Sequence, residues 1–269
     1  MSSSSPPRTG AGPFQSHHIR SGDAYELSNG HPIYCAPTGR DGTEANGLGY
    51  AVLSTDPAVQ RAGVDTGLAL GRNTLRAPDI AVNFEGAQGA WATSAPLVVE
   101  YAGQGQDEAE LRAKIVELHA AGTRHVWVVR LVGTPRVEVH DKGAPVRTAV
   151  PGQMLTAPGV LHNPVRVEAL FDREAAHETA LANLLQRKGY SDLDAVRAEG
   201  REEGRDAGRD EGREEALQLA LKTALTARGW TLDAEQSSRV AACHDVATLT
   251  RWIARAVTAP RCDDVFLDP

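Results

Sequence analysis

Hydrophobic and polar positions alternate in several short runs within the first two-thirds of the chain, which is the pattern of half-buried strands. A hairpin is predicted over residues 25–34, where Asn29-Gly30, a dipeptide typical of tight turns, separates two alternating runs. Two short apolar runs, 76–82 and 95–102, predict neighbouring strands. Further strands are predicted over 67–70, 124–131, 136–140, 154–160 and 165–170, the last two completing the sheet.

The hydrophobic positions take up the helical period over residues 107–121, where Leu111, Ile115 and Leu118 recur on one face. Acidic residues in the first turns and the glycine after this segment mark the start and the stop of the predicted helix. A weaker pattern predicts another helix over 47–53.

After residue 171 the pattern is helical throughout. Helices are predicted over 172–188, 214–228, 233–242 and 246–258, with a further helix start near Ser191. The expected core of the last helices consists of Leu232, Val240, Leu249, Trp252, Ile253 and Val257. So short a region is too small for a large core of its own, and packing against another chain is expected.

Together these patterns predict an α/β fold with a mixed central sheet flanked by helices, followed by an all-α extension. The parts are a disordered tail (1–20), an α/β domain (21–170), a helical connector (171–198) and a helical extension (199–269). The tail is rich in Ser, Pro and Gly, so it cannot offset the entropy of ordering.

The segment 198–213 is a low-complexity repeat of four residues. Glycines stand at 200, 204, 208 and 212 and arginines at 201, 205, 209 and 213. Each glycine inside a helix costs about 0.8–1.0 kcal/mol relative to alanine, so the four cost about 3–4 kcal/mol. Two interpretations stay open: a solvated spacer, or a glycine groove that lets a partner helix approach closely in a coiled-coil-like homotypic contact through residues 199–228.

Composition narrows the functional classes. A formal net charge of −7 argues against a protein that coats nucleic acid without specificity, because such proteins carry a basic field. The three cysteines are far apart and lack zinc-ligand spacing, so neither a disulfide framework nor a zinc site is indicated. No apolar run approaches a membrane span and the N-terminus lacks the apolar region of a secretory signal, so a cytoplasmic protein is expected.

Two acids interrupt the apolar runs named above, Asp79 in the first and Glu100 in the second. A carboxylate on a buried strand is costly unless a cation compensates it. Carboxylate oxygens are hard ligands and favour Mg²⁺ or Mn²⁺. The pair therefore predicts a metal site on adjacent strands.

The identity and spacing of these residues resemble the PD-(D/E)xK phosphodiesterase core and, within it, the Uma-two family of restriction-endonuclease-like proteins. The resemblance covers about residues 25–170. It is carried by Tyr25-Glu26-Leu27 with Gly30, Ala77-Pro78-Asp79, Pro96-Leu97-Val98-Val99-Glu100, the helix with Lys114 that ends at Ala121-Gly122, and the strand 125–129. The generic motif places a lysine two residues after the glutamate, where this chain has Ala102; members of the family keep a lysine in the following helix, which makes Lys114 the candidate.

The resemblance implies a restriction-endonuclease-like fold and roles for the matching residues. Asp79, Glu100 and the backbone carbonyl of Tyr101 would hold Mg²⁺, for which Mn²⁺ can substitute. Lys114 would act on the attacking water, although a lysine at the border of an apolar helix face can instead extend to solvent. Glu26 corresponds to an acid near the metal, or is a solvated carboxylate on an edge strand.

The predicted function is metal-dependent hydrolysis of DNA phosphodiester bonds. A homodimer is expected because cleavage of both strands of a duplex requires two active sites. The alternative is a catalytically inactive nuclease fold that acts as a binding or scaffold protein and oligomerises through its C-terminal helices, which the alanine at position 102 and the acidic net charge favour.

Overall fold

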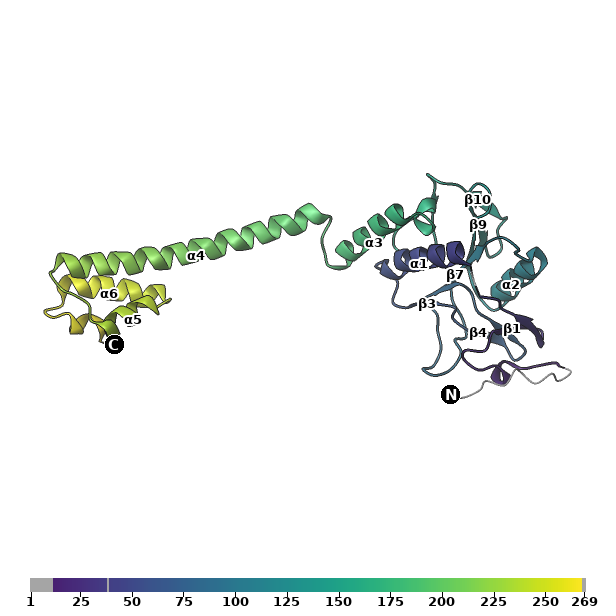
Figure 1. Ribbon diagram of the computed structural model, residues 1–269, viewed down its shortest axis with the longest axis horizontal. Coiled ribbons are helices and arrows are strands. Elements are labelled where there is room, and N and C mark those ends of the chain that lie inside the picture. The colour runs from purple at the N-terminus through teal and green to yellow at the C-terminus, as the bar shows by residue number, and fades with distance from the viewer. Residues whose placement is uncertain (1–11, 38, 268–269) are drawn as a thin grey trace. The chain divides into compact units, whose positions relative to one another are not determined.

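The computed structural model describes residues 12–37 and 39–267 (Figure 1). The chain divides between Asp192 and Leu193 into two compact units, which are described separately. Residues 1–11 of the predicted tail lie outside the described residues. The rest of that tail contains a 3₁₀ turn, Ser16–His18, and the Phe14 amide donates a hydrogen bond to the Gly30 carbonyl at 2.8 Å, so order begins before residue 21.

The described residues of the first unit form three sheets and three α-helices. In chain order its elements are β1 Tyr25–Ser28, β2 His31–Tyr34, α1 Arg40–Thr55, β3 Ala62–Val64, β4 Leu68–Gly71, β5 Thr74–Arg76, β6 Ile80–Val82, β7 Leu97–Ala102, α2 Glu108–Ala120, β8 His125–Arg130, β9 Arg136–Asp141, β10 Arg147–Ala149, β11 Met154–Leu155, β12 Val165–Arg166, the 3₁₀ turn Val167–Leu170 and α3 Arg173–Arg187.

The largest sheet has the strand order β10-β9-β8-β7-β6-β3, and only β7 and β8 run parallel in it. This arrangement confirms the predicted mixed central sheet. A smaller sheet has the order β2-β1-β5-β4 and contains the predicted hairpin, whose turn residues Asn29 and Gly30 both adopt positive φ, 49° and 82°. The third sheet pairs β11 with β12.

Two sequence predictions for the strands are wrong. The segments 154–160 and 165–170 do not complete the central sheet, because their short strands β11 and β12 pair with each other and β10 occupies the edge. The run 76–82 is also not one strand. It is divided at Ala77-Pro78-Asp79, so that β5 belongs to the small sheet and β6 to the central one. Proline lacks the N–H that a sheet ladder requires, which accounts for the break.

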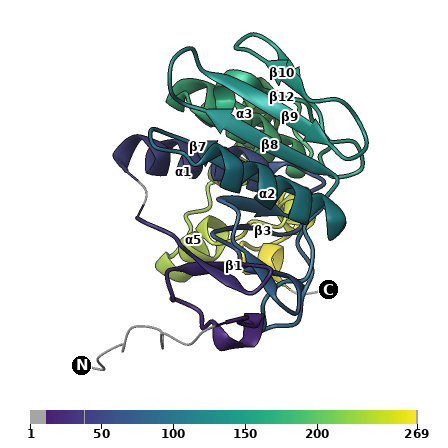
Figure 2. The ribbon, with the colours of Figure 1, turned by 90° about the vertical axis from the view of Figure 1, so that its right-hand side faces the viewer.

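Helices cover both faces of the central sheet (Figure 2). On one face α1 and α3 pack over side chains that include Val99, Tyr101 and Trp127. On the other face α2 packs through Leu111, Ile115 and Leu118. Because α3 is part of the first unit, the predicted connector is not a separate segment, and the boundary lies five residues after α3 ends at Arg187.

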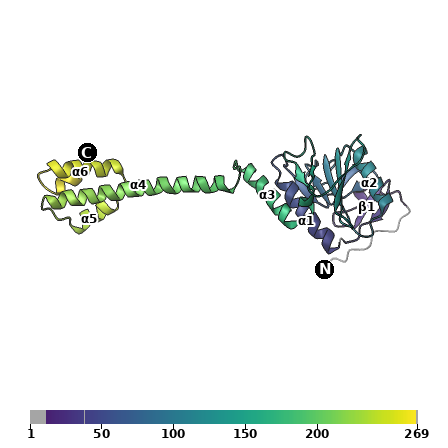
Figure 3. The same cartoon turned by 90° about the horizontal axis from the view of Figure 1, so that it is seen from above.

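The second unit contains α4 Leu193–Ala227, α5 Ala234–Ala241, α6 Val246–Thr258 and the 3₁₀ turn Asp263–Phe266. Within it α5 and α6 pack beside the C-terminal part of α4 (Figure 3). Leu221 and Leu225 of α4 are buried there with Trp252, whereas Val257, predicted in the core, is 68% exposed. The buried face of α6 runs through Ala256 instead. No helix of the described parts is both long and apolar enough to span a membrane.

Candidate active site

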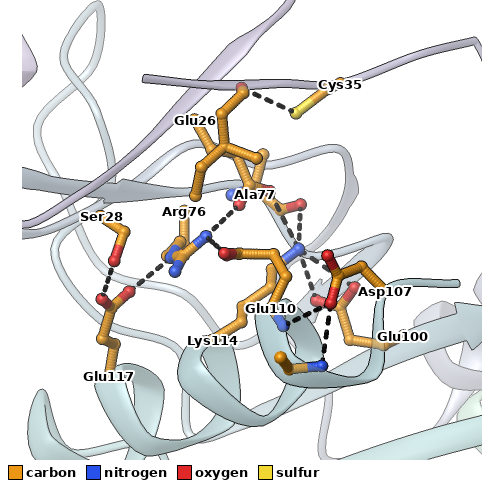
Figure 4. A network of polar contacts seen from close by, with 12 residues as sticks. Glu26, Ser28, Cys35, Arg76, Ala77, Glu100, Asp107, Glu110, Lys114 and Glu117 are labelled. Atoms are coloured by element: carbon orange, nitrogen blue, oxygen red, sulfur yellow. Dashed lines mark hydrogen bonds and ion pairs between the residues drawn. The ribbon is translucent and has the colours of Figure 1, made fainter. Parts of the chain in front are cut away.

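Four residues singled out from the sequence come together where the small sheet, the central sheet and α2 meet. Glu26 lies on β1, Asp79 follows β5, Glu100 lies on β7 and Lys114 lies on α2. The Lys114 ammonium donates hydrogen bonds to Glu26 Oε1 at 2.9 Å and to Glu100 Oε2 at 3.0 Å (Figure 4). Asp79 joins this group through the backbone, since the Tyr101 amide donates to its Oδ2 at 2.6 Å.

The alternation of β7 decides which side Glu100 faces. Val98 and Ala102 lie in the apolar cluster under α2, whereas Val99 and Tyr101 lie in the cluster under α1. Successive side chains of a strand point to opposite faces, so Glu100 faces α2 with Val98 and Ala102. A lysine at position 102 would occupy that same side. Here α2 covers it and supplies Lys114 instead.

Lys114 is buried beside the apolar face of its helix, and its side chain is only 11% exposed. It therefore does not extend to solvent, the alternative that the sequence left open. The ammonium also donates a hydrogen bond to the Ala77 carbonyl at 2.9 Å, next to the break between β5 and β6. Its three acceptors come from three separate segments, so the lysine is held at the meeting point of both sheets.

Glu26 is a buried carboxylate and not a solvated one, since its side chain is 8% exposed. Its Oε1 accepts hydrogen bonds from Lys114 and from the Ala77 amide, at 2.9 and 3.0 Å. Its Oε2 accepts one from Arg76 Nη1 at 3.0 Å. Both oxygens are thus engaged by the protein.

Arg76 is the residue of this region that the sequence did not single out. It is fully buried at the end of β5, and its guanidinium forms ion pairs with Glu26, Glu110 and Glu117 at 3.0, 2.6 and 2.5 Å (Figure 4). A signal was present, because an arginine opens the apolar run and acids follow at helical spacing around Lys114. The partners lie 34 to 50 residues away in the sequence, which spacing alone does not connect.

The charges of this cluster do not balance. Five carboxyl groups, those of Glu26, Asp79, Glu100, Glu110 and Glu117, surround the two cations Arg76 and Lys114. An excess of negative charge in a poorly solvated site favours the binding of a further cation.

The pKa values follow from this arrangement. Burial raises the pKa of Glu100, and the neighbouring Asp79 and Glu26 add to that rise against the opposing effect of Lys114. Burial also raises the pKa of Asp79. For Lys114, burial alone would lower the pKa, but Glu100 and Glu26 raise it above its ordinary value. Likewise burial opposes ionisation of Glu26, yet Lys114 brings its pKa below the ordinary value. The lysine is therefore charged, whereas Asp79 and Glu100 are the carboxyl groups that burial makes costly to ionise unless a further cation binds beside them.

The donor set fits a divalent cation held by few side chains. Within residues 12–37 and 39–267 no group of three or more His, Cys, Asp or Glu side chains is arranged to hold a metal. Two carboxylates remain: Glu100 Oε1 is buried without a hydrogen bond, although the ammonium lies 2.9 Å away, and Asp79 is committed through Oδ2 alone. These are hard oxygen donors, suited to Mg²⁺ or Mn²⁺.

Another candidate from the sequence is less well placed. The Tyr101 side chain lies on the opposite face of β7, where its hydroxyl donates to the Leu170 carbonyl at 2.9 Å, so only its backbone carbonyl is a possible ligand.

Comparisons with known proteins place this geometry in context. A family model described as "Uma2: Putative restriction endonuclease" matches residues 14–166. Among solved structures, the crystal structure of a "putative nuclease belonging to DUF820" from Anabaena variabilis ATCC 29413 is similar, with a TM-score of 0.50 and 14% identity over 59% of this chain and 94% of that chain. At that identity the likeness shows a shared fold. No curated protein matches the chain.

Proposed function

The chain belongs to the Uma2 family, and from this premise we propose that it is a metal-dependent endonuclease that hydrolyses phosphodiester bonds of DNA. The observation that carries the proposal is the position of Lys114. The motif position 102 holds alanine, yet a lysine from α2 lies within 3.0 Å of Glu100 and is held there by Glu26. Lys114 thus reaches, from another element, the side of β7 that a lysine at position 102 would occupy.

In the proposed site Asp79, Glu100 and the backbone carbonyl of Tyr101 hold Mg²⁺ or Mn²⁺. When bound, the ion lowers the pKa of a water molecule and offsets the charge that builds up on the phosphate. All three N–H groups of Lys114 are engaged in this structure, by Glu26, the Ala77 carbonyl and Glu100. Lys114 would therefore orient the attacking water with the N–H group that now donates to Glu100, once that carboxylate is engaged by an ion, and it stays protonated because Glu26 and Glu100 raise its pKa.

In the reaction the water oxygen forms a bond to phosphorus and the water releases a proton to solvent, while the bond from phosphorus to the leaving sugar oxygen breaks and that oxygen takes up a proton from solvent. Glu26 does not bind a second ion in this scheme, because Lys114, Arg76 and the Ala77 amide already occupy its oxygens. Its role is to hold the lysine.

The experiment that tests the proposal is cleavage of supercoiled plasmid and of single-stranded DNA by the full chain, with Mg²⁺ or Mn²⁺ and with EDTA as the control. Asp79→Asn and Glu100→Gln are expected to abolish cleavage while circular dichroism stays unchanged. Asp141→Asn is the matched control, because Asp141 lies on β9 of the same sheet and pairs with His125 outside the cluster. Cleavage retained in both site variants would refute the metal site.

A second candidate function is a catalytically silent scaffold. The observation that favours it is the Lys114–Glu100 ion pair, which already neutralises one of the two carboxylates. Calorimetry separates the candidates, because an active site requires Mg²⁺ or Mn²⁺ binding that Asp79→Asn removes. Absence of both binding and cleavage in the wild type would establish the scaffold.

We also propose that the chain forms a homodimer through residues 199–228 of α4. A Cβ added at any of the four repeat glycines would meet no other atom within 4 Å, so packing within the chain does not account for them. Leu219, on the same helix, is 66% exposed. An arginine follows each of the four glycines and a glutamate precedes three of them, with Ala207 before the third, so a second copy running in parallel would place arginine opposite glutamate at most of these positions. Sedimentation of the full chain tests this, and a monomer at all concentrations would contradict it.

A further inference from the structure

The buried guanidinium of Arg76 has no part in the reaction scheme above. It is completely inaccessible to solvent, and three carboxylates hold it through Nε and Nη1. Its Nη2 is buried without a hydrogen-bond partner among the described residues. A buried charge costs free energy, and well-packed apolar residues in its place are often equally or more stable. Stability alone therefore does not account for an arginine here.

The partners of Arg76 on α2 flank Lys114. Glu110 precedes the lysine by four residues and Glu117 follows it by three, so all three side chains lie on one face of the helix. The Glu117 carboxylate also accepts a hydrogen bond from the Ser28 hydroxyl at 2.5 Å, which ties the same turn to β1. Arg76 thus fixes α2 to β5 on both sides of the lysine (Figure 4).

The third partner, Glu26, connects Arg76 to the lysine directly. Its Oε2 accepts from Arg76 Nη1 at 3.0 Å, and its Oε1 accepts from Lys114 at 2.9 Å. The guanidinium therefore determines how the carboxylate that receives the ammonium is oriented. A planar fork can serve three carboxylates at fixed angles, whereas a lysine in its place would provide one flexible point charge.

We propose that Arg76 is a positioning residue that sets Lys114 against Glu100 for phosphodiester hydrolysis, by clamping the helix turns on both sides of Lys114 and by orienting Glu26. The proposal rests on the function proposed above. The proposed role of Arg76 is geometric, so a lysine at position 76, which has the same charge but another shape, would not reproduce it.

The test compares Arg76→Lys with Arg130→Met in the full chain. Arg130 is the matched control, because it also joins α2 to the central sheet, through Glu108 at 2.5 Å and Glu138 at 2.9 Å, but away from Lys114. Arg76→Lys is expected to lower kcat roughly 10- to 100-fold, as misplacement of a reacting group does, with KM and calorimetric Mg²⁺ binding unchanged. Arg130→Met is expected to leave kcat unchanged. Glu117→Gln, which removes one anchor without burying a new cation, is a second variant and is expected to lower kcat in the same direction.

A second readout does not depend on catalysis. The chain has four lysines, and Lys142, Lys188 and Lys222 are exposed whereas Lys114 is buried. Acetylation with acetic anhydride, followed by mass spectrometry, gives the labelling of Lys114 relative to these three internal references. Arg76→Lys is expected to increase it and Arg130→Met is not.

Wild-type kcat together with unchanged protection of Lys114 in Arg76→Lys would overturn the proposal, because a role in charge compensation alone predicts that result. If the wild type fails to cleave DNA, the function proposed above fails. Labelling then still decides whether Arg76 positions the lysine.

Discussion

The two units of this protein differ in how far their charged side chains are buried and in how far apart in the sequence their ion-pair partners lie. In the first unit the charged side chains that contact Lys114 or share its partner are buried, and they are held by partners from other segments; they are Glu26, Arg76 and Glu100. In the second unit residues 198–213 of α4 expose acids and arginines throughout, and their ion pairs are local, such as Arg209 with Asp206 three residues before it. The same residue types thus give a defined geometry where water is excluded and a solvated surface where it is not.

Replacing the buried lysine is expected to have the largest effect on function. Lys114→Met should lower kcat by roughly 10²- to 10⁴-fold, because a positioned donor or acid–base group contributes about that much. Plasmid cleavage under single-turnover conditions measures it, with Lys222→Met on α4 as the control. A variant as active as the wild type would show that the buried lysine contributes nothing to kcat.

Glu26 is the carboxylate that pairs with both Arg76 and Lys114, and removing it tests how much these buried ion pairs contribute to stability. Glu26→Ala should lower the free energy of unfolding of the first unit by about 3–5 kcal/mol, because it leaves Arg76 and Lys114 with an uncompensated buried charge. Urea unfolding followed by tryptophan fluorescence measures the loss. A loss of unfolding free energy below about 1 kcal/mol would mean that the ion pairs of Glu26 contribute no more than exposed surface ion pairs do.

The lowered pKa of Glu26 predicts how the free energy of unfolding depends on pH. Because Lys114 lowers the pKa of Glu26 below its ordinary 4.5, ionised Glu26 stabilises the fold fully above pH 4.5, and this contribution is lost as the pH falls through the lower folded value. The difference in unfolding free energy between wild type and Glu26→Ala should therefore be constant above pH 4.5 and shrink below it. Unfolding series of both proteins from pH 7 to pH 3 check this, and a difference that grows on acidification would contradict it.

In the repeat, the backbone and not the charges should dominate stability. Replacing glycines 200, 204, 208 and 212 by alanine should stabilise α4 in the monomeric full chain by about 3–4 kcal/mol. An added Cβ at each position meets no atom of another part of the chain within 4 Å. Thermal melts of the full chain by circular dichroism, at dilutions where it is monomeric, measure the gain. A loss of stability would mean that the glycine face contacts another part of the protein.

The smallest effect is expected for the exposed charges. Asp206→Ala breaks the 2.9 Å pair with Arg209, in which both side chains are more than half exposed, and should cost no more than about 0.5 kcal/mol. The same urea series gives this value. A cost of several kcal/mol would remove the distinction between the two units.

Local signals in the sequence predicted much of the fold. The Asn29-Gly30 turn, the acidic start of α2 and the glycine that follows α2 act within a few residues, and the structure has these elements where they were expected. Where local signals were weak, the prediction failed. β10 consists of Arg147-Thr148-Ala149, which has no apolar alternation and becomes a strand only by pairing with β9.

The candidate site was predicted in part for the same reason. Asp79 and Glu100 could be found because each interrupts an apolar run, and Lys114 because the family that the chain resembles keeps a lysine in this helix. The role of Arg76 could not be found, since it depends on Glu26 and Glu117 arriving from 50 residues before and 41 residues after it. A long-range ion pair of this kind leaves no periodic trace in the sequence.

The alternation of β7 also bears on how this protein can change over generations. Glu100 lies two positions from Val98 and two from Ala102, so the three side chains share the face of β7 toward Lys114. Loss or gain of a single codon within the strand would turn the carboxylate toward α1 and carry the Tyr101 ring to the other side. A substitution beside Glu100 leaves this geometry in place, as alanine does at position 102, whereas a one-residue insertion or deletion in β7 would separate Glu100 from Lys114.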